Sequence, residues 1–339
     1  MSLHDAVLSA LGSVADVRLV ASLRDPRLGF NSTTDLHLFI PDLHLVSNEV
    51  RPRYKYGTNE LGMLTSALAA LGELRSVEKA RARRIGVFQM GDFLDIWRET
   101  PFLTPGFDAA ARITDSHPAL MSEFGSGRLG ARFLLGNHDF ELFRHERFNR
   151  MSKRRFFLAP ASASAAGLAL HGDIFDWQEQ FPDAFQSLVV FYISPLREPE
   201  ERHLEEMLAL VHTENRELNL TEGIAGTARL GAVAALQPHQ VNVPERFNLT
   251  SHKFLGPAKD LCQRLNRDLQ FNMHYAVIGH THHARIAVDE SSNGFFALID
   301  TGAWIESCEL PDGSRLPNAQ LTAISDNEVR IYQLIRRTV

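Results

Sequence analysis

The sequence predicts an α/β protein in which layered sheets are built from strands that alternate with helices. Short apolar runs typical of β-strands recur from residue 35 onward, and each is followed by polar residues. Helical patterns fill several of the gaps, as with Leu61, Leu64, Leu68 and Leu71. The 339 residues are 44% hydrophobic and 22% charged, close to the globular average, so the composition excludes a disordered or collagen-like chain.

Residues 1–34 are interpreted as an N-terminal extension. Residues 3–11 carry a short apolar helical pattern, which leads into a loop that contains Pro26, Gly29 and Asn31. We expect this helix to pack on the core as a cap.

The core is expected to comprise residues 35–176 and 271–339, where most of the strand patterns lie. Five apolar runs end in polar residues: LHLFI before Asp42, RIGVFQM before Asp92, ARFLL before Asn137, GLALHG around His171 and YAVIG before His280. The later runs FFALID and VRIYQLI are expected to complete a sheet. Because ligands of layered α/β proteins collect beyond the carboxyl ends of the strands, we expect the functional residues there.

Residues 177–270 interrupt the alternation and are interpreted as a helical insertion. Pro199 opens one helical pattern, and Pro257 opens another in which the apolar residues are Leu261, Leu265 and Leu269. The insertion lies between His171 and His280, so we expect it to form a cap beside the site. It either lines a groove for an acyl or aromatic group or packs against the core or a partner.

Charge and cysteine content exclude several classes of protein. The 35 Lys and Arg residues stand against 41 Asp and Glu residues, a net charge of −6, so we expect no nucleic-acid binding through a basic surface. Cys262 and Cys308 are too far apart for a CxxC motif, which argues against a thiolate zinc site. We expect a cytoplasmic protein with no transmembrane segment, because no signal peptide or membrane-spanning run is recognisable. The oligomeric state stays open.

Five polar segments hold the candidate site. They are Asp42-Leu43-His44, Gly91-Asp92-Phe93-Leu94-Asp95, Gly136-Asn137-His138-Asp139, His171-Gly172-Asp173 and Gly279-His280-Thr281-His282. Together they offer carboxylate, imidazole and amide oxygen without sulfur, the ligands that hard and borderline transition metals prefer. Taken alone, Asp42-x-His44, GDxxD and HGD are common as turns or helix caps, whereas GNHD and GHTH are more specific. All five in this order, each at the end of a strand, favour a metal site.

The order D-x-H, GD-x-x-D, GNHD, HGD and GH-x-H resembles the calcineurin-like metallophosphoesterase superfamily. The resemblance implies a four-layer αββα sandwich with two divalent metal ions per chain, either Mn, Fe or Zn. It also implies hydrolysis of phosphate esters or phosphoanhydrides by a hydroxide bound between the two metals. One metal would be held by Asp42, His44, Asp92 and His282, and the other by Asp92, Asn137, His171 and His280. Asp92 would bridge them.

His138 has no metal in this assignment, and we expect it to act on the substrate. It would stabilise the transition state or protonate the leaving oxygen, while Asp139 orients its imidazole. Asp95 and Asp173 are expected to support the ligands, or else to serve as a helix cap and a turn residue. The other histidines, His252 among them, are interpreted as ordinary packed or exposed residues.

Within the superfamily the chain most resembles a bacterial branch that includes UDP-2,3-diacylglucosamine diphosphatase. The shared features are DLHL, GDFLDIW, Phe140 after Asp139 and a helical insertion before GHTH. That branch typically has Arg where this chain has His138. The expected activity is therefore a metal-dependent phosphoesterase or pyrophosphatase that acts on a phosphorylated small molecule or nucleotide conjugate. The alternatives are a Ser/Thr protein phosphatase and a non-catalytic scaffold, although the complete set of ligands argues against a scaffold.

Overall fold

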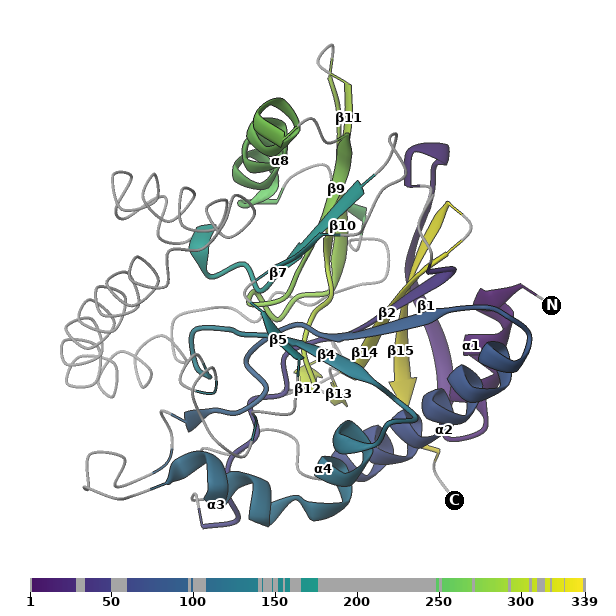
Figure 1. Ribbon diagram of the computed structural model, residues 1–339, viewed down its shortest axis with the longest axis vertical. Helices are drawn as coiled ribbons and strands as arrows, with labels where there is room; N and C mark the ends of the chain where they lie inside the picture. Colours follow the sequence, from purple (N-terminus) through teal and green to yellow (C-terminus); the bar gives the residue numbers. More distant parts are fainter. Residues whose placement is uncertain are drawn as a thin grey trace.

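The computed structural model shows two mixed β-sheets, a two-stranded hairpin and, among the described residues, five α-helices (Figure 1). This is the α/β class predicted from the sequence. The structure describes residues 2–28, 34–49, 60–96, 99, 108–139, 142, 148, 152–154, 156–158, 166–175, 248–249, 252–269, 272–291, 294–304, 307–309, 315–317, 319–325 and 327–337.

The first sheet has seven strands in the order β1-β15-β14-β2-β3-β4-β5. Strands β2 to β5 are parallel, whereas β14, β15 and β1 are antiparallel to their neighbours. Because β2, β3 and β4 run in the same direction, the residues that follow them come to one edge of the sheet. The bounds are β1 Asp16–Arg24, β2 Leu36–Ile40, β3 Ile85–Gln89, β4 Ala131–Leu134, β5 Ser152–Arg154, β14 Gln320–Ser325 and β15 Glu328–Ile335.

The second sheet has six strands in the order β6-β7-β9-β11-β10-β8. Strands β7, β9 and β11 are parallel and end near the same edge. The bounds are β6 Phe156–Leu158, β7 Ala166–Leu170, β8 Asn248–Leu249, β9 Met273–Ile278, β10 Arg285–Ser291 and β11 Gly294–Asp300, while the hairpin comprises β12 Ser307–Glu309 and β13 Arg315–Pro317. The segments that follow β2 and β11 are joined where the Trp304 N–H donates to the Asp42 carbonyl at 2.8 Å.

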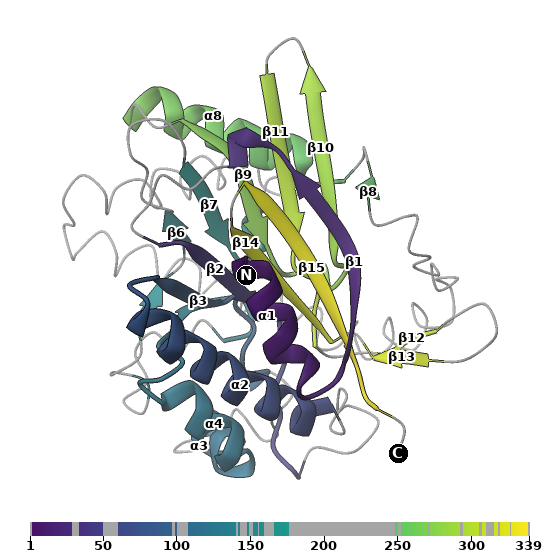
Figure 2. The ribbon, with the colours of Figure 1, turned by 90° about the vertical axis from the view of Figure 1, so that its right-hand side faces the viewer.

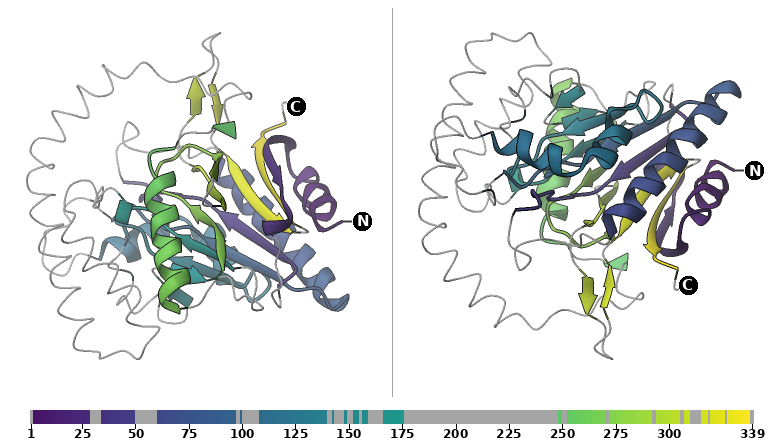
Figure 3. Two further views of the ribbon diagram at one scale, coloured as in Figure 1. Left: turned by 90° about the horizontal axis from the view of Figure 1, so that it is seen from above. Right: turned by 90° about the horizontal axis from the view of Figure 1, so that it is seen from below.

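Helices cover both sheets, as Figures 2 and 3 show. Helices α1 and α2 pack against the seven-stranded sheet, and α8 packs against the six-stranded sheet. A third apolar cluster contains residues of both sheets. The bounds are α1 Leu3–Gly12, α2 Glu60–Ala80, α3 Ala109–Ser116, α4 Pro118–Gly125 and α8 Leu255–Leu269, with a short 3₁₀ helix at Pro26–Leu28.

Alternation along the strands explains how each sheet is buried on both faces. Leu38 and Ile40 of β2 pack under the helices, whereas Phe39 between them faces the other sheet. In β9, Ala276 packs on the side of α8, whereas Val277 packs between the two sheets. Such strands have no polar face, which is why their sequences are continuous apolar runs.

The N-terminal residues contain a strand that the sequence analysis did not predict. Helix α1 confirms the helical pattern at residues 3–11, and its N-cap Ser2 forms a capping box with Asp5. Residues 16–24, however, form β1 and pair with β15 along its length, from Asp16 opposite Ile335 to Arg24 opposite Glu328. Exposed and buried positions do not alternate regularly in β1, so its sequence lacks a clear strand pattern.

The predicted helical insertion is described only at its C-terminal end. Helix α8 confirms the helix predicted after Pro257, with Leu261 and Leu265 buried against the six-stranded sheet. The helix predicted after Pro199 and the cap as a whole lie outside the described residues. None of the helices among the described residues is both long and apolar enough to cross a membrane.

Candidate metal centre

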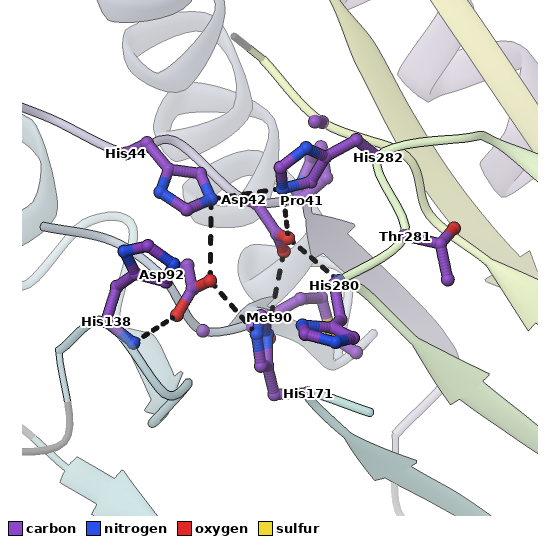
Figure 4. Close-up of polar contacts among 12 residues, drawn as sticks. Pro41, Asp42, His44, Met90, Asp92, His138, His171, His280, Thr281 and His282 are labelled. Atoms are coloured by element: carbon purple, nitrogen blue, oxygen red, sulfur yellow. Dashed lines mark hydrogen bonds and ion pairs between the residues drawn. The ribbon is translucent and has the colours of Figure 1, made fainter. Parts of the chain in front are cut away.

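Side chains from all five polar segments come together where strands of the two sheets end (Figure 4). Backbone hydrogen bonds join the segments in pairs. The His44 N–H donates to the Asp92 carbonyl at 2.8 Å, and the Gly279 N–H donates to the His171 carbonyl at 2.9 Å. The seven predicted metal ligands, Asp42, His44, Asp92, Asn137, His171, His280 and His282, therefore lie in one small region.

The backbone of this region is held in an unfavourable conformation. His44, Asp92, His280 and His282 have φ angles of 44°, 47°, 70° and 61°, in the left-handed region that side chains disfavour. Each such residue costs on the order of 1–3 kcal/mol and persists only where its surroundings hold it in place. Four of the candidate ligands carry this backbone strain, which indicates that their geometry serves a function.

Two glycines allow the carboxylates to approach the backbone closely. A Cβ atom on Gly136 would lie 2.0 Å from Asp92 Oδ1, and one on Gly279 would lie 2.3 Å from Asp42 Oδ1. Neither position accepts any other residue without displacing a carboxylate. The glycines of GNHD and GHTH are thus explained by the packing of the site.

The first group of candidate ligands comprises Asp42, His44 and His282. Nε2 of His44 lies 3.0 Å from Nε2 of His282, which in turn lies 3.4 Å from Asp42 Oδ2. Nδ1 of His44 donates to Asp95 Oδ2 at 3.2 Å, so Nε2 is the nitrogen that faces the group. Burial lowers the pKa of His44 despite the opposing effect of Asp92, which favours the neutral imidazole that a metal requires.

The second group comprises Asp92, His171 and His280. Nδ1 of His171 donates to the Met90 carbonyl at 3.0 Å, so Nε2 faces Asp92 Oδ2 at 3.1 Å and Asn137 Oδ1 at 3.2 Å. Asn137 thereby joins this group. Burial acts to lower the pKa of His171, but Asp92 and Asp42 outweigh it and raise that pKa to about 10.

Asp92 lies between the two groups. Its Oδ2 is 3.4 Å from His44 Nε2 and 3.1 Å from His171 Nε2, while its Oδ1 accepts the His138 N–H at 3.0 Å. Burial acts to raise the pKa of Asp92, but the surrounding imidazoles, His171 first, hold it well below its usual range. The carboxylate therefore occupies the position expected of a bridging ligand.

Asp42 supplies a test of whether a cation fits this site. Its Oδ2 accepts the His280 N–H at 2.8 Å and lies 3.4 Å from His282 Nε2, whereas its buried Oδ1 has no hydrogen-bond partner among the described residues and lies 3.7 Å from His171 Nδ1. A buried carboxylate is unfavourable unless a cation or hydrogen bonds compensate its charge, and a metal ion beside Oδ2 would supply that compensation. The donor set of carboxylates, imidazoles and one amide also suits Mn, Fe or Zn.

The expectation that Asp139 orients His138 is wrong. Nδ1 of His138 donates to Asp95 Oδ1 at 3.0 Å. Asp139 instead accepts the N–H groups of Phe93 and Gly136 at 2.7 and 2.8 Å, and so joins two of the polar segments. Burial, then the nearby Asp92, raises the pKa of Asp139 to about 7.

Three residues beside the centre were given no role by the sequence analysis. His252 and Asp300, which are buried, and Thr281, which is half-buried, form a hydrogen-bonded network behind the Gly279–His282 loop. Only the strand end FFALID carried a signal for Asp300, and nothing in the sequence distinguished His252 from the other scattered histidines.

No model of a protein family matches the chain, and no curated protein matches it significantly.

Proposed function

We propose that the chain is a dinuclear metallophosphoesterase that hydrolyses phosphate esters or phosphoanhydrides. The observation that carries this proposal is the buried Asp92 carboxylate, which lies between two groups of nitrogen and oxygen donors. A carboxylate shared between two cations reduces their repulsion and sets their spacing, which two-metal hydrolysis requires. A relationship to the calcineurin-like metallophosphoesterases is part of the proposal.

The chain divides its ligands between two positions. Asp42, His44 and His282 would hold one ion, Asn137, His171 and His280 would hold the other, and Asp92 would contact both. When bound, two ions of Mn, Fe or Zn would acidify a water molecule and neutralise charge on the phosphoryl oxygens.

His138 is assigned the proton transfer to the leaving oxygen. Its ring is 23% exposed beside the centre, and its Nδ1 is held by Asp95, so Nε2 is the nitrogen that exchanges the proton. Burial acts to lower the pKa of His138, but Asp92 and Asp95 outweigh it and raise that pKa. A raised pKa favours the protonated imidazole, the form that a general acid requires.

The proposed architecture is the four-layer αββα sandwich. It is supported by three apolar clusters, one between α1, α2 and the seven-stranded sheet, one between the two sheets, and one between the six-stranded sheet and α8. The proposed substrate is a phosphorylated small molecule or nucleotide conjugate, and the proposed location is the cytoplasm. The net charge of −6 supports a substrate other than a nucleic acid.

A hydrolysis screen of the purified chain tests this proposal. The panel contains phosphomonoesters, phosphodiesters, nucleoside diphosphate conjugates and phosphopeptides, each with and without Mn²⁺ after treatment with a chelator. We expect Mn²⁺-dependent hydrolysis that favours small molecules, and loss of both metal equivalents in Asp92→Asn. A preference for phosphopeptides would favour the protein phosphatase, and two bound ions without any hydrolysis would favour the scaffold. A wild-type chain that binds no metal would refute the proposal.

A further inference from the structure

The loop that carries His280 and His282 is anchored on the side away from the metal centre. Thr281 lies between the two histidines, and its side chain points away from the cluster (Figure 4). The Thr281 hydroxyl donates a short hydrogen bond to Oδ2 of Asp300, which is completely buried at the end of β11. The Gly302 N–H donates to the other carboxylate oxygen at 3.2 Å. The loop is therefore anchored to the six-stranded sheet, through Asp300 at the end of β11.

A histidine extends this anchor to the start of α8. Nε2 of His252 donates to Asp300 Oδ2 at 3.1 Å, and the Phe254 N–H donates to His252 Nδ1 at 3.0 Å. These two bonds define the tautomer, because Nδ1 accepts and Nε2 donates. The His252 imidazole is buried, so no water replaces either bond. The chain of bonds therefore runs from Phe254 through His252 and Asp300 to Thr281.

The same segment also contacts a candidate ligand directly. The ring of Phe254 stacks on the ring of His280, with 6.4 Å between the centroids and 24° between the planes. Phe175 also packs against Phe254, with 5.5 Å between the ring centroids. Residues 252–254 thus support the loop at two places, through the hydroxyl of Thr281 and through the imidazole of His280.

We propose that His252, Asp300 and Thr281 are positioning residues that orient His280 and His282 toward the two metal positions. This inference rests on the proposed dinuclear centre. His280 and His282 belong to different ligand groups, and both have left-handed φ angles, 70° and 61°. Such a backbone is retained only where neighbouring contacts hold it. Thr281 is the residue between them, so its anchored hydroxyl acts on the direction of both imidazoles.

Metal binding by metal-free protein tests this inference without reference to activity. The variants are Thr281→Val, which replaces the hydroxyl by a methyl group of similar shape, and His252→Ala. His252→Gln serves as a rescue variant, because its amide nitrogen can still donate to Asp300. Titration calorimetry gives the Kd for Mn²⁺, the absorption spectrum of bound Co²⁺ reports ligand geometry, and thermal melting in chelator reports the stability of the metal-free fold.

We expect Thr281→Val and His252→Ala to weaken Mn²⁺ binding about tenfold, the lower end of the range for groups that orient metal ligands. Both should also alter the Co²⁺ spectrum, and His252→Gln should restore it. His4→Ala is the matched control, because His4 is also buried and contacts the carbonyls of Ser325 and Glu328, both at 3.2 Å, away from the centre. It should lower the melting temperature and leave the Kd unchanged.

An unchanged Kd and Co²⁺ spectrum in Thr281→Val and His252→Ala, with two ions bound by the wild type, would overturn the positioning role and leave the proposed function intact. If His4→Ala loses as much Mn²⁺ affinity, the loss would be explained by a general decrease in stability. That result would also overturn the positioning role. If the wild-type chain binds no metal, the proposed function fails and this inference fails with it. If His252→Ala does not fold, Thr281→Val decides the question alone.

Discussion

At the scale of single residues, Asp95 connects the candidate metal ligand His44 to the proposed general acid. One carboxylate oxygen accepts from His44 Nδ1 at 3.2 Å and the other from His138 Nδ1 at 3.0 Å. Burial acts to raise the pKa of Asp95, but these hydrogen bonds outweigh it and hold that pKa far below its usual range. Asp95 therefore remains an acceptor and sets the tautomer of both imidazoles.

Replacing His138 should separate catalysis from metal binding. His138→Ala is expected to lower kcat by about 10²–10⁴-fold, the range for general acid–base groups, with both metal equivalents retained. Steady-state kinetics and metal analysis of the same sample check this outcome. A substrate with an acidic leaving group serves as the control, because it needs no proton donor and should lose less activity. Loss of metal from the variant would assign His138 to the ligands instead.

A second residue-scale prediction concerns His37, which is buried in β2 beside the rings of Phe39 and Phe88. Burial, then the nearby Arg132, lowers the pKa of His37 from 6.5 to about 4. As the pH falls from about 6.5 to about 4, the unfolded chain takes up a proton that the folded chain excludes. Stability should therefore fall by up to about 3 kcal/mol over this range.

Urea unfolding at several pH values measures this effect. The variant His37→Gln cannot titrate, so its stability should fall less between pH 6.5 and pH 4 than that of the wild type. Other histidines contribute to both curves, and the difference between the curves isolates His37. Parallel curves for the two proteins would show that the pKa of His37 is ordinary.

At the scale of elements, α1 and β1 behave as parts of the core. Strand β1 forms the edge of the seven-stranded sheet, and α1 packs against both α2 and β14. Leu11 of α1 is completely buried in the cluster beneath the helices, whereas Leu8 of the same helix is 40% exposed. An N-terminal segment of this kind stabilises the whole sheet rather than a separate unit.

Two alanine substitutions in α1 test this integration. Leu11→Ala should lower the free energy of unfolding by about 2–5 kcal/mol, the range for a buried leucine. Leu8→Ala, the control on the exposed face, should change it by less than about 0.5 kcal/mol. Equilibrium unfolding in urea measures both values. Equal small effects would indicate that α1 is only loosely attached to the core.

At the scale of the whole molecule, the candidate centre joins the two sheets. Asp42, Asp92 and Asn137 follow strands of the seven-stranded sheet, whereas His171 and His280 follow strands of the six-stranded sheet. Metal ions held by both sets of ligands would cross-link the sheets at their shared edge. Binding energy at the site would then contribute to global stability, because a ligand that binds only the folded state stabilises it.

Thermal melting measures this contribution. Added Mn²⁺ at about one hundred times its Kd should stabilise the folded chain by about 2.7 kcal/mol for each site, and a chelator should reverse the increase in melting temperature. Mg²⁺ is a suitable comparison, because it prefers oxygen ligands to imidazole and should stabilise less. A melting temperature that does not respond to Mn²⁺ would contradict the proposed cross-link.

Local patterns in the sequence determined the class of the fold and the set of candidate ligands. The apolar runs LHLFI, RIGVFQM and YAVIG became β2, β3 and β9, because strands buried on both faces must be continuously apolar. The polar segments after them supplied the candidate ligands, because parallel strands bring their carboxyl ends to one edge. These inferences needed only neighbours along the chain.

Only the tertiary structure decided which residues support those ligands. His138 is paired with Asp95, 43 residues away, and not with the adjacent Asp139; His252 reaches Asp300 across 48 residues; and β1 pairs with β15 at the opposite end of the chain. Each pairing depends on the relative position of two elements that are far apart in the sequence. Local sequence patterns do not determine that position. Hydrogen bonds between remote buried groups form wherever packing brings them within reach, so they become visible only once the sheets have been assembled.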